Sequence, residues 1–87
     1  IAKGAIGDAF AQLEQPVEAL KYYERAASMS SSELTAPRFL LKAGITATTL
    51  GKTAIALKHF NVIIEKYPKS PEAKKAILYQ GKAEAMK

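Results

Sequence analysis

The sequence predicts an all-α fold in which antiparallel pairs of helices stack on one another. Three observations predict it. Alanine supplies 16 of the 87 residues, which favours closely packed helices over β-sheets, where β-branched and aromatic residues are enriched. The chain repeats with a period of 37 residues, marked by Gly7, Gly44 and Gly81. Proline and glycine residues also fall where such helices would begin and end.

The 37-residue period extends beyond the three glycines. Four pairs of apolar residues share this spacing: Leu13 and Leu50, Ala19 and Ala56, Leu20 and Leu57, and Tyr23 and Phe60. Because one helix pair cannot bury its apolar face alone, successive pairs must stack to form a continuous core. We therefore expect a single repeat domain over residues 1–87, with repeats over about 1–34 and 35–70 and a capping or partial-repeat helix over about 71–87.

The first repeat is predicted to contain two helices. Residues 2–13 carry apolar residues at helical spacing, namely Ile6, Phe10 and Leu13. Pro16 suits the first turn of a second helix, whose apolar face comprises Val17, Leu20, Tyr23, Ala26 and Ala27. The serine-rich stretch 28–32 should end this helix, because serine side chains compete for backbone hydrogen bonds.

The third helix has a signal at each end. Thr35 is expected to cap it, with Pro37 in its first turn. Gly51 suits the left-handed conformation that ends many helices. Its residues expected to face the core are Leu40, Leu41, Ala43, Ile45, Ala47 and Leu50.

The fourth and fifth helices are separated by a short turn. The fourth should run over about 52–67 and stop before Pro68, and the fifth should begin at Pro71 with Ser70 as its cap. The residues of the fourth helix expected to be buried are Ile55, Ala56, Leu57, Phe60, Ile63 and Ile64.

Small residues indicate how each helix pair packs. Gly7 is expected to face Ala19, and Gly44 to face Ala56, so that the paired backbones approach to about 8 Å. The space between successive pairs would then be filled by the aromatic residues of the second helices, Tyr23 and Phe60.

Charge is distributed unevenly along the chain, whose formal net charge is +5. Residues 1–34 carry three basic and five acidic residues, whereas residues 35–87 carry ten basic and three acidic ones. The basic half could attract an acidic partner, although dispersed lysines also occur on ordinary solvated helices. Nucleic-acid binding is not expected, because it would need aromatic residues interleaved with a dense basic stripe.

Composition excludes several kinds of chemistry. The sequence has no cysteine, one histidine and no run of about 18 apolar residues. Disulfides, thiolate nucleophiles and the usual zinc sites are therefore excluded, and no membrane contact by this segment and no export leader is predicted. Because the chain begins with Ile1 inside a predicted helix, we expect it to be part of a longer protein.

Two motifs that could bind a ligand are better explained structurally. Gly51-Lys52-Thr53 resembles the end of a phosphate-binding loop, but residue 46, where an earlier glycine is required, is threonine. His59 has only apolar residues one helical turn away, so we predict a surface or partly covered residue and not a metal ligand or a catalytic base.

The acidic and serine residues also lack catalytic arrangements. Glu14 and Glu18 flank the Pro16 turn as solvated acids. No residue in the sequence is placed to activate the serines at positions 28, 30, 31 and 32. We predict no catalytic residue, no metal site and no cofactor, and hence no enzyme.

The repeat pattern resembles the tetratricopeptide repeat family, whose 34-residue pattern is W-x2-L-G-x2-Y, then A-x3-F, then P. The residues that carry the resemblance are Gly7, Phe10, Ala19, Tyr23 and Ala26 in the first repeat, Gly44, Gly51, Ala56, Phe60 and Pro68 in the second, and Gly81 in the third. The departures are the longer period and the residues at the tryptophan, aromatic and closing-proline positions, Lys3, Leu40, Ala47 and Ser31. The resemblance implies a right-handed superhelix of five helices, or about two and a half repeats.

The resemblance also implies a binding surface. In tetratricopeptide arrays the first helix of each pair lines a concave groove that receives a peptide or protein. Register carries this groove over to Asp8, Gln12, Arg38, Lys42, Ile45, Thr49, Lys75, Tyr79 and Lys82. Such a groove would be basic with apolar spots and would suit an extended or acidic peptide, although ordinary solvated residues are the alternative. The clamp that grips chaperone tails is not reproduced, because only Lys75 matches it.

The sequence thus predicts a non-catalytic scaffold for protein interaction. Residues 60–71 with Ala73 and Ala76 are similar to repeats of bacterial cell-envelope tetratricopeptide proteins, which implies an envelope complex facing the periplasm. One alternative is a homo-oligomer formed through apolar residues near the ends of the array, Ile1, Ile77, Leu78 and Met86. Another alternative is an accessory domain of a larger enzyme.

Overall fold

A computed structural model describes residues 3–30 and 32–85, and this part of the chain forms five helices and no strand. The helices are α1 (Lys3–Gln12), α2 (Pro16–Met29), α3 (Ala36–Thr49), α4 (Thr53–Lys66) and α5 (Pro71–Ala85). The predicted all-α class is confirmed, and the helix boundaries lie close to the predicted ones. Ile1, Ser31 and Met86, for which predictions were made, lie outside the described residues.

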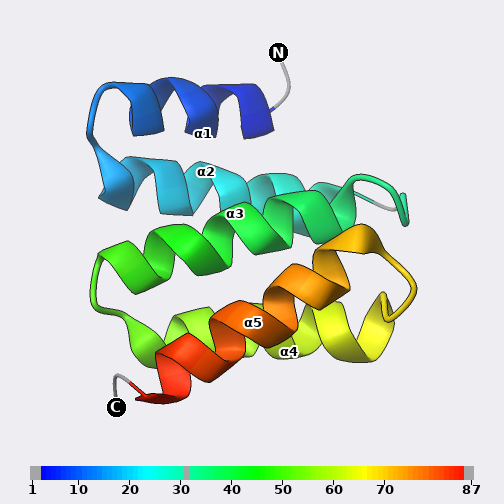
Figure 1. The fold of residues 1–87 in the computed structure, drawn as a ribbon. Coiled ribbons are helices and arrows are strands. Elements are labelled where there is room, and N and C mark those ends of the chain that lie inside the picture. The colour runs from blue at the N-terminus through cyan, green and yellow to red at the C-terminus, as the bar shows by residue number, and fades with distance from the viewer. Residues whose placement is uncertain (1–2, 31, 86–87) are drawn as a thin grey trace.

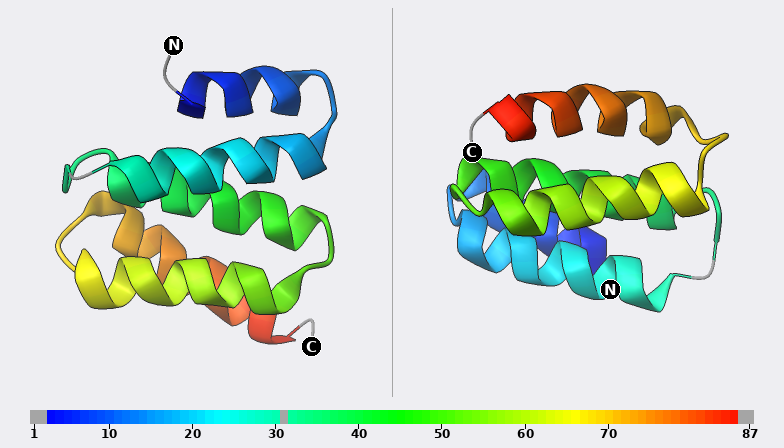
Figure 2. Two further views of the ribbon diagram at one scale, coloured as in Figure 1. Left: turned by 180° about the vertical axis from the view of Figure 1, so that it is seen from behind. Right: turned by 90° about the horizontal axis from the view of Figure 1, so that it is seen from below.

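Consecutive helices lie side by side and run antiparallel (Figure 1), and α3 also packs against α5. Figure 2 shows α1 and α5 on opposite sides of the stack. The molecule measures 32 × 28 × 16 Å, and its thinnest dimension corresponds to two layers of helices about 8 to 10 Å apart. None of the described helices is both long and apolar enough to cross a bilayer.

The starts of the helices follow the sequence signals with one exception. Pro16 and Pro71 are the first residues of α2 and α5, where a missing N–H costs no helical hydrogen bond. Ser70 caps α5, since the backbone N–H of Ala73 donates to its Oγ at 3.2 Å. Thr35 occupies the N-cap position of α3, as predicted, but it is not a hydrogen-bonding cap. Its hydroxyl makes no capping bond and instead hydrogen-bonds the Ser30 hydroxyl across the α2–α3 loop.

Two helices end in the same hydrogen-bonded turn. At the end of α3, Gly51 has φ +74°, as predicted, and the N–H of Lys52 donates to the carbonyl of Ala47 at 2.9 Å. At the end of α1, Glu14 has φ 57°, and the N–H of Gln15 donates to the carbonyl of Phe10 at 2.8 Å. Glu14 lies 37 positions before Gly51, so the first repeat uses the same turn without the glycine that favours it.

The glycines of α1 and α3 accommodate aromatic rings. A Cβ atom at Gly7 would lie 2.7 Å from Cδ1 of Tyr23, and one at Gly44 would lie 2.8 Å from Cζ of Phe60. The atoms nearest to a Cβ at either glycine therefore belong to these rings. Each ring thus packs against the glycine of its own repeat, and the Phe60 ring also stacks on Tyr79 of α5, as expected for an aromatic residue between successive helix pairs. That Gly7 faces Ala19 and Gly44 faces Ala56 stays a prediction.

The core is a narrow strip that continues through both repeats. It comprises Ala19, Leu20, Tyr23, Leu41, Ala43, Ala47, Ala56, Phe60, Ile63, Ala73 and Ala76. Most of the predicted core residues of α3 and α4 belong to it or pack against it, including the half-buried Ile55 and Ile64. The predictions for Leu13 and Val17 are wrong, because these side chains are 66% and 56% exposed. Both lie beside the α1–α2 turn, where no other described helix covers them.

Candidate functional site

The predicted groove residues lie on the first helix of each pair. Asp8 and Gln12 are on α1, the residues from Arg38 to Thr49 are on α3, and those from Lys75 to Lys82 are on α5. Five of the side chains are exposed, namely Gln12, Arg38, Thr49, Lys75 and Lys82. The other four are partly covered and make contacts within the chain, namely Asp8, Lys42, Ile45 and Tyr79.

Asp8 and Lys42 bind each other and do not act as separate groove charges. The Lys42 ammonium donates to both carboxylate oxygens of Asp8, at 2.9 and 3.1 Å. The Tyr23 hydroxyl donates to the same carboxylate, and the Lys42 ammonium lies 5.6 Å from the centre of the Tyr23 ring. The cluster therefore joins α1, α2 and α3 and neutralises the charge that Lys42 was expected to offer a partner.

This cluster shifts two pKa values in opposite directions. The hydrogen bond from Lys42 lowers the pKa of Asp8, and the bond from Tyr23 adds to the effect. Burial raises the pKa of Tyr23, and the hydrogen bond to the Asp8 carboxylate raises it further. Asp8 therefore stays ionised and Tyr23 stays protonated across the neutral range.

On α5, Tyr79 is held by the core beneath it. Its ring stacks on Phe60 with the ring centres 5.9 Å apart, and the Lys82 ammonium lies 5.5 Å from the Tyr79 ring centre. A neighbouring contact is the hydrogen bond that Gln80 donates to Asn61 on α4. Tyr79 and Lys82 thus form a packed aromatic and basic spot on α5.

Arg38 lies in a cleft of about 460 Å³ at one end of the helices. The cleft is formed by the α2–α3 loop, the first turn of α3, the α4–α5 turn and the first turn of α5. Its lining residues are Glu33, Leu34, Arg38, Lys66, Tyr67, Pro68, Lys69, Ser70, Pro71 and Glu72. Leu34 is 78% exposed. The cleft therefore combines three basic side chains with an exposed apolar surface.

Among these lining residues, the sequence predicted only Arg38 as part of a binding surface, whereas Pro68, Ser70 and Pro71 were expected to shape the turn before α5. The others come from the α2–α3 loop and from the segment that comprises the end of α4, the α4–α5 turn and the start of α5, and these two regions are far apart in the chain. Antiparallel helices place every second connection at the same end of a stack. The order of the helices therefore indicated that these two regions of the chain would lie close together. The residue types did not mark a binding surface, because Leu34, Lys66 and Lys69 are ordinary loop or surface residues.

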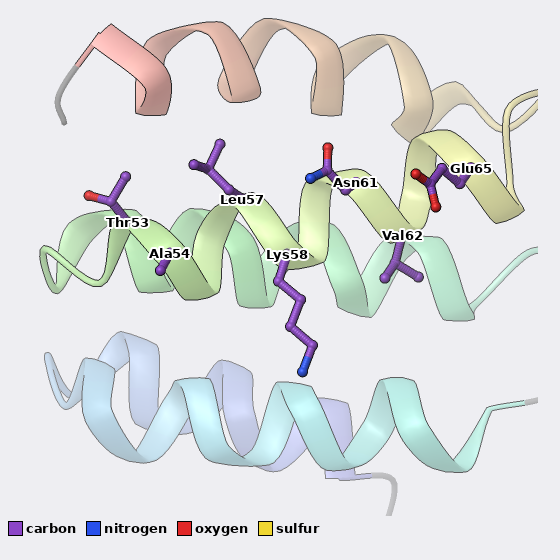
Figure 3. A pocket seen from close by; sticks show the side chains of 7 residues that line it. All are labelled: Thr53, Ala54, Leu57, Lys58, Asn61, Val62 and Glu65. Atoms are coloured by element: carbon purple, nitrogen blue, oxygen red, sulfur yellow. The ribbon is translucent and has the colours of Figure 1, made fainter.

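A larger recess, of about 710 Å³, runs along α4 (Figure 3). All of its lining residues belong to this helix: Thr53, Ala54, Leu57, Lys58, Asn61, Val62 and Glu65. Figure 3 shows Leu57 and Asn61 directed toward α5 and Lys58 directed toward α2. Because its lining comes from one helix, the recess is an open helix face on which no polar groups converge from different elements.

His59 has a partner that neighbouring positions in the sequence did not reveal. Its Nε2 atom lies 2.7 Å from Oε2 of Glu24 on α2, and the His59 side chain is 12% exposed. The prediction of a partly covered histidine is confirmed. The contact joins the second helices of the two repeats, and no group of three or more potential metal-ligating residues occurs in the described part of the chain.

Comparison with known families gave a match to one type of repeat, in the middle of the chain. Residues 39–70, which cover most of α3, all of α4 and the turn to α5, match the family model of the tetratricopeptide repeat. Searches of curated proteins and of solved structures gave no significant match. The matched region contains the Gly44–Phe60 contact that the first repeat reproduces at Gly7 and Tyr23. The match supports a tetratricopeptide-repeat family, whose repeats are generally non-catalytic modules that bind protein or peptide partners.

Proposed function

We propose that the chain is a non-catalytic interaction module that binds an extended peptide with acidic and apolar residues. The peptide would lie along α3 and α5 and end in the cleft at Arg38. The observation that carries the proposal is the composition of this cleft, where Arg38, Lys66 and Lys69 surround the exposed Leu34.

Charge favours an acidic ligand on this side of the molecule. Three basic side chains line the cleft against two acidic ones, Glu33 and Glu72. Lys75 and Lys82 extend the positive charge along α5, where both are exposed. Lys42 contributes less, because Asp8 neutralises it. Complementary charge would steer the ligand and fix its register, while the apolar contacts would supply affinity.

The experiment is a selection of displayed random 12-residue peptides on the 87-residue chain. We expect enriched peptides to carry a net negative charge and apolar residues. Their binding should be lost with the triple variant Arg38→Glu, Lys66→Glu, Lys69→Glu. It should also weaken as salt is raised, because exposed charges are screened.

A matched variant controls for net charge. Lys21→Glu, Lys52→Glu, Lys58→Glu changes the charge equally at three exposed positions outside the cleft, and it should bind the selected peptides like the parent chain. Equal binding by both triple variants, or enrichment of neutral or basic peptides, would show that the cleft is not the site. Lys42 is left unchanged, since a glutamate there would face Asp8.

Three narrower expectations stay predictions. A bacterial envelope location rests only on the similarity of residues 60–76, and the chemistry of the cleft does not depend on it. Self-association and service as an accessory domain of an enzyme likewise stay predictions. Light scattering on the 87-residue chain tests self-association.

A further inference from the structure

The two junctions between successive helix pairs use the same three repeat positions with different chemistry. At the first junction these positions hold Asp8, Tyr23 and Lys42, and at the second they hold Ile45, Phe60 and Tyr79, each 37 positions later. The Lys42 ammonium lies 5.6 Å from the centre of the Tyr23 ring. In the same way, Tyr79 stacks on Phe60 with ring centres 5.9 Å apart, and Ile45 packs against the core. An apolar set therefore closes the second junction, so packing alone does not require the polar set at the first.

The polar set retains hydrogen-bonding capacity. A carboxylate has about four acceptor positions, and an ammonium has three N–H donors. Oδ1 of Asp8 accepts from the Tyr23 hydroxyl and from Lys42, whereas Oδ2 accepts, among the described residues, only from Lys42 at 3.1 Å. Lys42 uses two of its donors in these contacts. One acceptor and one donor thus remain side by side, on side chains that are 46% and 38% exposed.

A primary carboxamide matches this pair of groups. Its C=O and one of its N–H groups lie on the same edge, so its oxygen can accept from Lys42 while its nitrogen donates to Asp8. A main-chain peptide group cannot do both, because its N–H and C=O point in opposite directions in the trans form. A carboxylate has no proton to donate to Asp8 and would be repelled by it.

We propose that the Asp8–Lys42 pair is a subsite for the side-chain carboxamide of an Asn or Gln residue in the bound peptide. The subsite belongs to the groove of the proposed function, on which its role rests. Lys42 lies four positions after Arg38, which is about 6 Å along α3. Residues i and i+2 of an extended peptide are about 6.6 Å apart and point to the same side. The ligand should therefore carry its carboxamide two positions from the carboxylate that binds Arg38.

The second junction supplies the test variant. Asp8→Ile, Tyr23→Phe, Lys42→Tyr transfers its apolar set to the first junction. The net charge does not change, because one acid and one base are removed, so the long-range attraction for acidic peptides should stay the same. A second variant, Asp8→Leu, Tyr23→Phe, Lys42→Met, removes the same polar groups with smaller changes in volume. Circular dichroism checks that each variant is folded.

The experiment is a selection of displayed random 12-residue peptides on the parent chain and on both variants. The parent chain should enrich Asn or Gln two positions from an Asp or Glu, and the variants should enrich an apolar residue at that position. One enriched peptide is then titrated, with fluorescence anisotropy as the measure. Replacing its carboxamide residue by Asp or by Leu should weaken binding to the parent chain about tenfold. The Leu peptide should bind the variants at least as tightly as the original peptide does.

The cleft variant Arg38→Glu, Lys66→Glu, Lys69→Glu separates this subsite from the proposed function. Peptides that need the cleft but show no Asn or Gln position, or whose carboxamide preference survives in both junction variants, would refute the subsite alone. A second carboxylate enriched at this position would also refute it, since Lys42 would then act as a free cation. A carboxamide preference that both junction variants remove, in peptides that the cleft variant still binds, would support the subsite and contradict the cleft. A parent chain that selects no peptide would refute both.

Discussion

At the scale of single residues, the absence of a side chain at Gly44 determines how its repeat packs. Gly44→Ala would place a Cβ atom 2.8 Å from Cζ of Phe60, which is fully buried and stacked on Tyr79. Overpacking costs about 1–3 kcal/mol, whereas the better helix propensity of alanine returns up to about 1 kcal/mol. We expect a net loss of about 1–2 kcal/mol in the free energy of unfolding, measured by urea denaturation.

Gly81→Ala is the matched control for this substitution. Gly81 occupies the same repeat position but faces open space. Only the propensity gain applies there, so this variant should be more stable than the parent chain by about 0.5–1 kcal/mol. Equal stability of the two alanine variants would mean that the Phe60 ring does not depend on the glycine.

The Asp8 carboxylate makes stability depend on pH in the acidic range. Lys42 lowers its folded pKa below the value of about 3.9 expected in the unfolded chain. The contribution of Asp8 is therefore complete above about pH 4 and is lost as the pH falls through the lowered folded value. Because the Asp8 and Lys42 side chains are 46% and 38% exposed, we expect Asp8→Asn to cost only about 0.5–1 kcal/mol at pH 7.

Urea denaturation of the parent and Asp8→Asn chains at pH 7 and near pH 2 checks this prediction. The difference between the two chains should shrink toward zero at the lower pH. A difference that stays constant with pH would assign the loss to altered packing and not to the charge of Asp8.

At the scale of elements, the turns that end α1 and α3 differ in how well their left-handed residue tolerates a positive φ. Glu14 adopts φ 57° with a full side chain, and Gly51 adopts φ 74° with none. A left-handed conformation costs a residue other than glycine about 1 kcal/mol. Glu14→Gly should therefore stabilise the chain by about 0.5–1 kcal/mol, and Gly51→Ala should destabilise it by about 1 kcal/mol. Thermal unfolding followed by circular dichroism measures both, and shifts of the same sign would contradict the shared-turn interpretation.

Helix boundaries were predictable where a residue acts through its own backbone. Pro16 and Pro71 begin helices because proline fixes φ and needs no hydrogen-bond donor. At Thr35 the helix start was predicted correctly, but the expected capping hydrogen bond of the side chain does not form. Its hydroxyl bonds to Ser30 and not to the helix, and a bond between two loop residues depends on how the loop folds.

At the scale of the whole molecule, the contacts between repeats could not be predicted. His59 pairs with Glu24, 35 positions earlier, and Lys42 pairs with Asp8, 34 positions earlier. Neither spacing equals the 37-residue period, because these pairs link different surfaces of neighbouring repeats. The first pair joins α2 to α4 and the second joins α1 to α3, so each depends on how one repeat is rotated against the next.

The candidate site was likewise only partly predictable from the sequence. Register placed the predicted residues on the correct helices, since α1, α3 and α5 are the first members of their pairs. It did not distinguish the free charges, such as Arg38, from the paired Lys42. It also missed Leu34 of the α2–α3 loop, Lys66 at the end of α4 and Lys69 of the α4–α5 turn, which only the stacking of the helices brings together.

The sequence by itself determined the all-α class, the order and ends of the helices and the 37-residue repeat, because these depend on local propensity and periodic patterning. Tertiary structure alone decided that the rings of Tyr23 and Phe60 lie against Gly7 and Gly44, and that Asp8 neutralises Lys42. It also decided that Ile77 and Leu78 remain uncovered. The physical reason is that contacts between side chains depend on the rotation and spacing of whole helices, which no local pattern encodes.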